Sequence, residues 1–143
     1  MNRNGFQVDL EREYADVSGL GVLYFDLNNL KETNDKYGHA AGDALLRRIA
    51  DVLRLICAQL KHAKCYRVGG DEFVLLLTQS TREALKYCAE MFGDCMDNHN
   101  QNETLPCSVA VGQAYSEGPC NPEMLVSQAD HAMYRCKQMM KDL

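Results

Sequence analysis

The sequence predicts an α/β (α+β) fold with a central, mostly antiparallel five-stranded sheet flanked by helices. Short apolar runs rich in β-forming residues occupy residues 21–27, 63–68, 73–78 and 105–114, which is typical of strands buried in one sheet. Between the runs, apolar residues recur every three or four positions, as on the buried face of a helix. A Gly-Gly link between the second and third runs indicates a hairpin, so the sheet is not purely parallel.

The first predicted strand, GVLYFDL at residues 21–27, is interrupted near its C-terminal end by Asp26. A carboxylate is unusual in such an apolar segment, so Asp26 is a candidate functional residue. Residues 28–42 are mostly polar and contain Gly38 and Gly42. They predict a short helix followed by a loop.

The clearest helix begins at Asp43. Its inward apolar residues are spaced by three and four, and they are Leu45, Leu46, Ile49, Val52, Leu53 and Ile56. Residues 63–68 and 73–78 then form the two strands of the hairpin. Gly69 and Gly70 between them tolerate positive φ, as the central residues of a hairpin turn often must.

Three more elements complete the predicted sheet and its helices. Thr81 is placed to cap a helix, because an apolar stripe at helical spacing follows it. The alternating residues 105–114 predict another strand, and Pro122 opens a last helix. The order strand, helix, helix, strand, strand, helix, strand, helix is that of one sheet covered by helices.

Composition limits the classes of partner. The formal net charge is −5 and no Lys/Arg run is present, so we expect no nucleic acid partner. No apolar stretch approaches the roughly 18 residues of a membrane span, so we expect no membrane contact and a cytoplasmic location for this domain. Membrane anchoring of a longer parent protein is left open.

The seven cysteines never form a CxxC pair and mostly fall at apolar positions of periodic segments. This pattern predicts reduced thiols in the core. His62 and Cys65 have the spacing of two zinc ligands, but a structural zinc site needs two more, and none is evident nearby. Zinc is therefore not expected.

The segment YRVGGDEF at residues 66–73 carries the strongest candidate chemistry. Asp71 and Glu72 follow the two glycines, and the alternative interpretation is that they are solvated turn residues. If the strands pair side by side, however, Asp26 joins them, and such a cluster of carboxylates requires a cation. Mg²⁺ fits, because it binds through one or two carboxylates and takes other ligands from water and substrate phosphates. Two such ions about 4 Å apart form the clamp of nucleotidyl transfer.

RVGGDEF, together with FDLNNLKETNDKYGHAAGD, resembles the GGDEF domain of diguanylate cyclases. The resemblance runs from NRNGF near the start to ADHAMYRCK near the end. It implies one GGDEF domain over residues 1–143, with a fold like that of adenylyl cyclase catalytic domains and polymerase palms. It also implies an enzyme that condenses two GTP molecules into cyclic di-GMP with release of pyrophosphate. Such an enzyme uses Mg²⁺ (or Mn²⁺), and it acts as a homodimer.

The resemblance also assigns roles by position. The metal ligands would be the carboxylates of Asp26 and Asp71 and the carbonyl of Leu27. Glu72 would lie near the metals and the attacking 3′-hydroxyl. The residues that would contact the substrate are Lys31, Asn34, Asp43, Gly69, Gly70, Lys137 and Lys141.

Among these substrate residues, Asn34 and Asp43 match the guanine-reading positions, and Lys31 and Lys137 match those that hold the triphosphate. A carboxylate can accept from both guanine N1–H and the 2-amino group. Asp43 in front of Ala44 is equally well placed as a helix N-cap, and that alternative stays open. The lysines could also be solvated helix residues.

The sequence departs from the family pattern at several positions. Only NR remains of the usual DxLTGLxNR opening, so we expect that the chain was excised from a larger multidomain protein. MKD replaces the GRN expected after Lys137, which leaves Lys141 to supply that positive charge without the bidentate fork of Arg. The Arg and Asp of the product-inhibition motif fall on Leu60 and Ala63. That pair of residues cannot bind the product, so we expect the inhibitory site to be lost. The altered MKD end favours the alternative function, a degenerate GTP-binding sensor or docking module without turnover.

Overall fold

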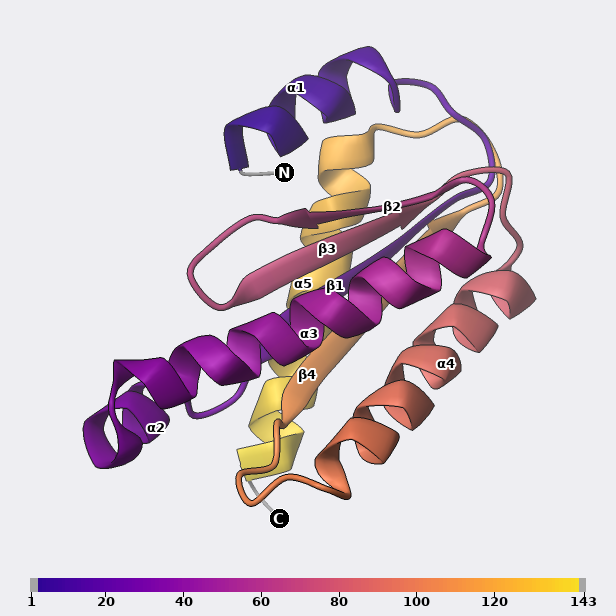
Figure 1. Cartoon of the computed structure of the whole chain (residues 1–143). Coiled ribbons are helices and arrows are strands. Elements are labelled where there is room, and N and C mark those ends of the chain that lie inside the picture. Colours follow the sequence, from indigo (N-terminus) through magenta and orange to yellow (C-terminus); the bar gives the residue numbers. More distant parts are fainter. Residues whose placement is uncertain (1–2, 142–143) are drawn as a thin grey trace.

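A computed structural model describes residues 3–141, and in this part of the chain four antiparallel strands form one sheet in the order β2-β3-β1-β4 (Figure 1). The strands are β1 (Leu20–Leu27), β2 (Ala63–Arg67), β3 (Glu72–Leu77) and β4 (Val109–Ser116). Each lies within or beside one of the predicted apolar runs. The mixed fold and its antiparallel sheet are confirmed.

The predicted count of five strands is wrong for the described residues. The segments between the four strands fold as helices and short turns, so no further run is available to pair with a sheet edge. The fourth strand also begins later than residue 105. The Asn100 side chain accepts from the Cys107 N–H and donates to the Cys107 carbonyl, both at 3.0 Å. These bonds satisfy Cys107 outside the ladder, and pairing with β1 starts at Val109.

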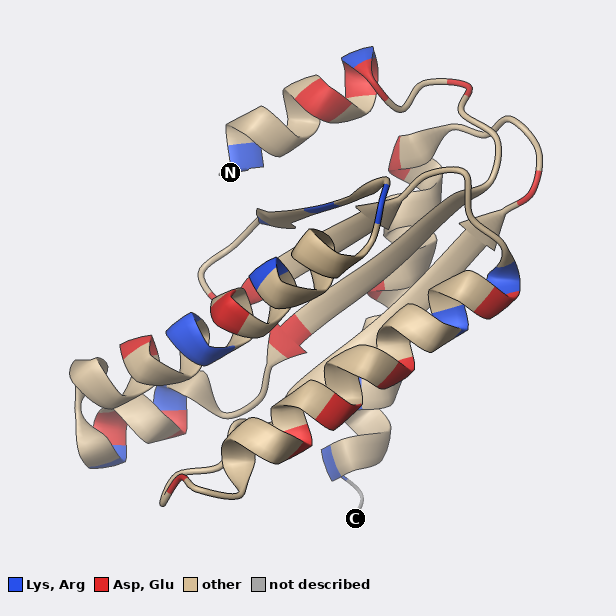
Figure 2. Cartoon of the chain, turned by 45° about the vertical axis from the view of Figure 1, so that its right-hand side comes forward, with Lys and Arg blue, Asp and Glu red and all other residues tan. Residues whose placement is uncertain are grey.

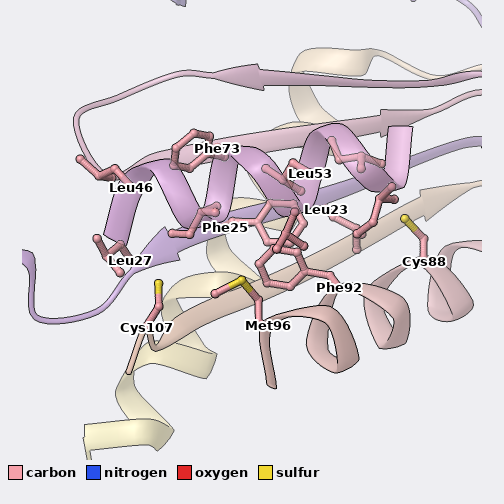
Figure 3. Packing of buried hydrophobic residues seen from close by; sticks show 14 of the residues in the cluster. Leu23, Phe25, Leu27, Leu46, Leu53, Phe73, Cys88, Phe92, Met96 and Cys107 are labelled. Carbon is pink, nitrogen blue, oxygen red and sulfur yellow. The ribbon is translucent and has the colours of Figure 1, made fainter. Parts of the chain in front are cut away.

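Helices cover both faces of the sheet (Figure 1). They are α1 (Arg3–Arg12), α2 (Leu30–Tyr37), α3 (His39–Gln59), α4 (Arg82–Asn100) and α5 (Pro122–Lys141). Along β1, Leu23, Phe25 and Leu27 pack with α3 and α4 (Figure 3), whereas Val22 and Tyr24 pack with α1 and α5. The two-residue period of the strand thus divides the core into two layers.

The sequence analysis missed helix α1. The helix has little apolar character overall, but Phe6, Leu10 and Tyr14 recur every four residues in and just after it, and all three are buried. This apolar spacing could have predicted the helix from the sequence. The helix is also tied to the sheet by polar contacts, because the Tyr66 hydroxyl donates to Asp9 Oδ2 at 2.8 Å.

The loop expected before Asp43 is almost absent. Only Gly38, at φ 93°, separates α2 from α3, which begins at His39. A side chain at Gly42 would collide with the Asn34 amide of α2, so the missing Cβ lets the two helices pack closely. Glycine here serves helix packing rather than a loop.

Further along the chain, Thr81 caps α4 as predicted, because its hydroxyl accepts from the Ala84 N–H at 3.0 Å. All seven cysteines are free thiols. Over residues 3–141, none of the helices combines the length and apolarity that a bilayer crossing requires.

Candidate functional site

The sheet brings Asp26 and Glu72 together. They are direct partners across the antiparallel β1–β3 pair, on the face of the sheet covered by α5. The neighbouring Asp71 is held by its backbone, since its carbonyl accepts from the Leu27 N–H at 2.9 Å. Figure 2 shows the acidic segment where β1 ends. Three acidic residues therefore lie at one end of the two central strands.

Asp26 is largely buried and has a single cationic partner. Its Oδ2 atom lies 2.9 Å from Lys137 Nζ, and the two side chains are 12% and 22% exposed. The other oxygen, Oδ1, is buried without a hydrogen-bond partner. Burial raises the pKa of Asp26, and the Lys137 hydrogen bond opposes that rise. The site thus holds a carboxylate that is only half satisfied, which is unusual for a buried polar group.

Glu72 is also perturbed. Its pKa is raised mainly by burial and then by the charges of Asp26, Asp130 and Asp71. A Cβ on Gly69 would lie 2.8 Å from Glu72 Oε1, so the absence of a side chain at Gly69 makes room for this carboxyl group. A raised pKa is the property expected of a carboxylate that accepts a proton near neutral pH.

The turn that carries Asp71 is not the expected one. Neither Gly69 nor Gly70 has positive φ, so the left-handed conformation does not explain the glycine pair. Instead, Arg67 donates through Nε to the Gly69 carbonyl (3.2 Å) and through a terminal nitrogen to the Gly70 carbonyl (2.6 Å). A Cβ on Gly70 would meet no atom within 4 Å, so the space beside it is open to a ligand.

The sequence analysis did not single out Arg67. Its place directly before the Val68–Gly69–Gly70 segment was a usable signal, because a guanidinium has several donors and a turn exposes carbonyls that need them. The guanidinium also lies 5.9 Å from the centre of the Phe73 ring. Arg67 therefore links the two ends of the hairpin turn.

The predicted base-reading residues lie at the α2–α3 corner, at the same end of the sheet as the hairpin turn (Figure 1). Asn34 Oδ1 is buried without a hydrogen-bond partner. Asp43 is exposed within α3, which begins at His39 with Gly38 as its N-cap. The alternative that Asp43 is the helix N-cap is therefore wrong.

The remaining predicted residues are dispersed around this end of the molecule. Lys31 is exposed in the first turn of α2, and Lys141 is exposed at the end of α5, one turn beyond Lys137. Of these three lysines, Lys137 is the one that pairs with a carboxylate of the cluster in the described part of the chain.

A groove of about 500 Å³ lies between α3 and the β2–β3 hairpin, and the three carboxylates are not among its lining residues. It is lined by Asp43, Leu46, Arg47, Ala50, Leu53, Arg54, Cys65, Tyr66, Arg67 and Phe73. The three arginines and the apolar floor suit a flat, anionic ligand. The groove extends from Asp43 to Arg67, the residue that donates to the Gly69 and Gly70 carbonyls.

The carboxylate oxygens are of the kind that Mg²⁺ binds. Within residues 3–141, no three His, Cys, Asp or Glu side chains converge as a complete metal site, and this finding also gives no support to zinc at His62 and Cys65. Mg²⁺ does not need such a cage, because phosphates and water supply most of its ligands. The unpartnered Asp26 Oδ1 is a hard oxygen of the required kind.

Comparison with known proteins identifies the family. The family described as diguanylate cyclase, GGDEF domain, matches residues 1–142. The chain is 32% identical over 127 residues to diguanylate cyclase DgcS of Shewanella oneidensis, covering 89% of this chain and 41% of that protein. It is 34% identical over 144 residues to cyclic di-GMP phosphodiesterase PdeR of Escherichia coli, covering 96% and 21%. The chain thus spans less than half the length of either relative.

A solved structure gives the same result at the level of the fold. The crystal structure of the GGDEF domain of PA1120 (YfiN or TpbB) from Pseudomonas aeruginosa matches with a TM-score of 0.78 and 28% identity. The match covers 97% of this chain and 91% of that one. The arrangement of sheet and helices described above is therefore shared with a solved domain.

Proposed function

The chain belongs to the GGDEF domain family of diguanylate cyclases, and we propose that it condenses two GTP molecules into cyclic di-GMP. The observation that carries this proposal is the half-satisfied Asp26, beside Asp71 and Glu72 at the ends of β1 and β3. A purely structural role would leave Asp26 Oδ1 buried without a partner and three acids together with one cation between them.

In the proposed reaction, the 3′-hydroxyl of one GTP attacks the α-phosphorus of the other, and pyrophosphate leaves. Asp26, Asp71 and the Leu27 carbonyl would hold Mg²⁺ or Mn²⁺, which supplies charge neutralisation at the phosphates when bound. Glu72 lies beside Asp26 and accepts the proton of the hydroxyl, for which its raised pKa suits it. Two such steps close the ring and release two pyrophosphates.

The substrate contacts follow from the placement of the remaining residues. Asp43 accepts from guanine N1–H and the 2-amino group, and Asn34 completes recognition of the base at the α2–α3 corner. Lys31, Lys137 and Lys141 contact the triphosphate. Gly70, which has open space beside it, lets the main chain approach the nucleotide.

Each site holds one GTP and the product joins two, so the enzyme acts as a homodimer whose two sites face each other. We place this activity in the cytoplasm, where GTP is available. The charge of −5 on each copy opposes their association, and the contact is therefore expected to be transient.

A GTP-binding module without turnover is the second candidate. Lys137 is bound to Asp26 rather than free for a phosphate, and Lys141 stands where the family carries Arg. The similarity to PdeR, whose name denotes a phosphodiesterase, shows that such a segment also occurs in a protein named for another activity. Turnover decides between the two candidates.

The test is incubation of concentrated protein with GTP and Mg²⁺, followed by quantification of cyclic di-GMP and pyrophosphate. We expect both products from the wild type and neither from Asp71→Asn. Asp71 is only partly buried, so the free energy of unfolding of this variant should lie within about 0.5 kcal/mol of that of the wild type. GTP binding without products from the wild type would support the module, and normal turnover by Asp71→Asn would remove Asp71 from the site.

A further inference from the structure

The contact between Lys137 and Asp26 is the starting point. Lys137 Nζ lies 2.9 Å from Asp26 Oδ2, and both side chains are mostly removed from solvent. Among the described residues, this is the one ion pair of Asp26. A partly buried pair of this kind is screened little by salt, so displacing the ammonium from the carboxylate requires a compensating charge.

Helix α5 holds the Lys137 backbone in a fixed place relative to the sheet. Gly112 of β4 touches the backbone of α5, and a Cβ there would overlap the Met133 N and Ala129 carbonyl and would lie 2.7 Å from Met133 Cα. Gly112 pairs with Tyr24 on β1, two residues before Asp26. Since Met133 precedes Lys137 by about one helical turn, the segment that carries Lys137 is packed closely against β4 where the side chain reaches Asp26.

We propose that Lys137 is the stand-in cation of the nucleotide-free site, neutralising Asp26 until a triphosphate draws its ammonium away. This inference rests on the proposed function, because it takes Asp26 as a metal ligand and the triphosphate as the group that Lys137 contacts. The same lysine then serves two partners in turn. Metal binding becomes conditional on nucleotide binding, and Lys137 is a positioning residue that couples them.

Chemistry favours this exchange. A triphosphate offers several anionic oxygens to a flexible ammonium, whereas Asp26 offers one carboxylate that already lacks a partner at Oδ1. Once the ammonium leaves, both Asp26 oxygens are without a cation. In the free protein the ammonium lowers the affinity of Asp26 for the metal, and by thermodynamic linkage that affinity is regained when nucleotide binds. Such couplings between two sites typically change affinity by about 5–150-fold.

The experiment is titration of the nucleotide-free protein with Mn²⁺, followed by electron paramagnetic resonance of the free ion. We expect Lys137→Gln to bind Mn²⁺ about tenfold more tightly than the wild type. Lys137→Arg, which keeps the charge, should bind it as weakly as the wild type does. The matched control is Arg135→Gln, because Arg135 is exposed on the same helix and this change removes the same charge away from Asp26.

Equal Mn²⁺ affinity in Lys137→Gln and the wild type would overturn the inference, as would an equal gain in Arg135→Gln. A parallel titration with 3′-deoxy-GTP, which lacks the attacking hydroxyl, separates this from the proposed function. Suppose that Asp26→Asn weakens Mn²⁺ binding in the presence of 3′-deoxy-GTP, but Lys137→Gln does not strengthen it in the absence of nucleotide. In that case only the inference fails. If Asp26→Asn has no effect with the nucleotide present, Asp26 is not a metal ligand, and both proposals fail.

Discussion

Burial determines the electrostatic state of the carboxyl groups at the strand ends. Asp26 and Glu72 face each other across β1 and β3, and burial raises the pKa of each. Of the two, Asp26 alone has a cation within ion-pair distance among residues 3–141. The protein therefore keeps an electrostatically unfavourable arrangement at this point, which is typical of a binding site that a charged ligand completes.

Glu72→Gln should stabilise the metal-free protein at neutral pH. The groups whose charges act on Glu72 are Asp26, Asp71 and Asp130, with Arg3 opposing them. The folded pKa of Glu72 is raised, so the carboxyl group destabilises the fold progressively as the pH rises from its unfolded pKa to its folded pKa, and fully above the latter. Below pH about 4.3 the two proteins should be equally stable, and the variant should gain as the pH rises through the folded pKa.

The gain should stay below about 1 kcal/mol, because Glu72 is only half-buried and solvent screens the charges around it. Thermal unfolding from pH 4 to pH 8 in a chelator measures it. A Glu72→Gln variant that is less stable than the wild type at pH 8 would show that Glu72 makes a favourable contact in the folded state.

Asp43→Ser should relax the choice of base. Asp43 is exposed and does not cap α3, so its carboxylate is free for a ligand. Adenine has no donor where guanine has N1–H and the 2-amino group, and a site built on such bonds can reject the wrong base by up to roughly 10⁴-fold. Competition between GTP and ATP, scored by the cyclic dinucleotides formed or by binding, measures the change. Equal discrimination by the two proteins would move base recognition to another residue.

At the scale of the elements, close backbone contacts position the functional side chains. Gly42 lets α2 approach α3 beside Asn34, and Gly112 lets α5 approach β4 one turn before Lys137. In each case a Cβ would collide with a neighbouring element. Glycine therefore acts here through close packing rather than through backbone flexibility.

Gly112→Ala should destabilise the protein by about 2–4 kcal/mol, because the new methyl group meets backbone atoms of α5 that cannot rotate away. The control is Gly93→Ala in α4, where a Cβ would meet nothing within 4 Å. That change should be neutral or stabilising by up to about 1 kcal/mol. Urea denaturation compares the two, and equal effects would mean that α5 can shift away from β4.

Periodicity could locate most elements but not their close contacts. The strands and the three longest helices follow from apolar spacing, and Thr81 caps its helix as its residue type predicts. Helix α1 was missed because its stripe lies in a polar segment. The predicted loop before Asp43 and the predicted start of the last strand were wrong, because side-chain contacts of Asn34 and Asn100 with a neighbouring segment decide them.

The candidate site shows the same limit. The pairing of Asp26 with the hairpin acids could be anticipated from strand order, since strands that pair align their ends. The Lys137–Asp26 contact could not, because it depends on how α5 is seated on β4. The Arg67 bonds to the turn carbonyls likewise depend on the conformation of the turn.

At the scale of the whole molecule, one copy offers one set of carboxylates at one end of its sheet. A product built from two nucleotides requires two such ends to meet, so we expect specific activity to rise with protein concentration. Activity assays diluted through the nanomolar range, alongside sedimentation of the same samples, test this expectation. A specific activity that stays constant on dilution would contradict a site shared between two copies.

The order of strands in the sheet has a consequence for folding. β1 is central and pairs with β3 and β4, both of which come much later in the chain. Topologies dominated by such non-local pairing fold slowly. Asp26 and Glu72 face each other only after β1 and β3 have joined, so the acidic cluster assembles with the whole domain rather than ahead of it. Amide hydrogens of β1 should accordingly exchange only through global opening, which makes their exchange rates a direct reporter of the integrity of the site.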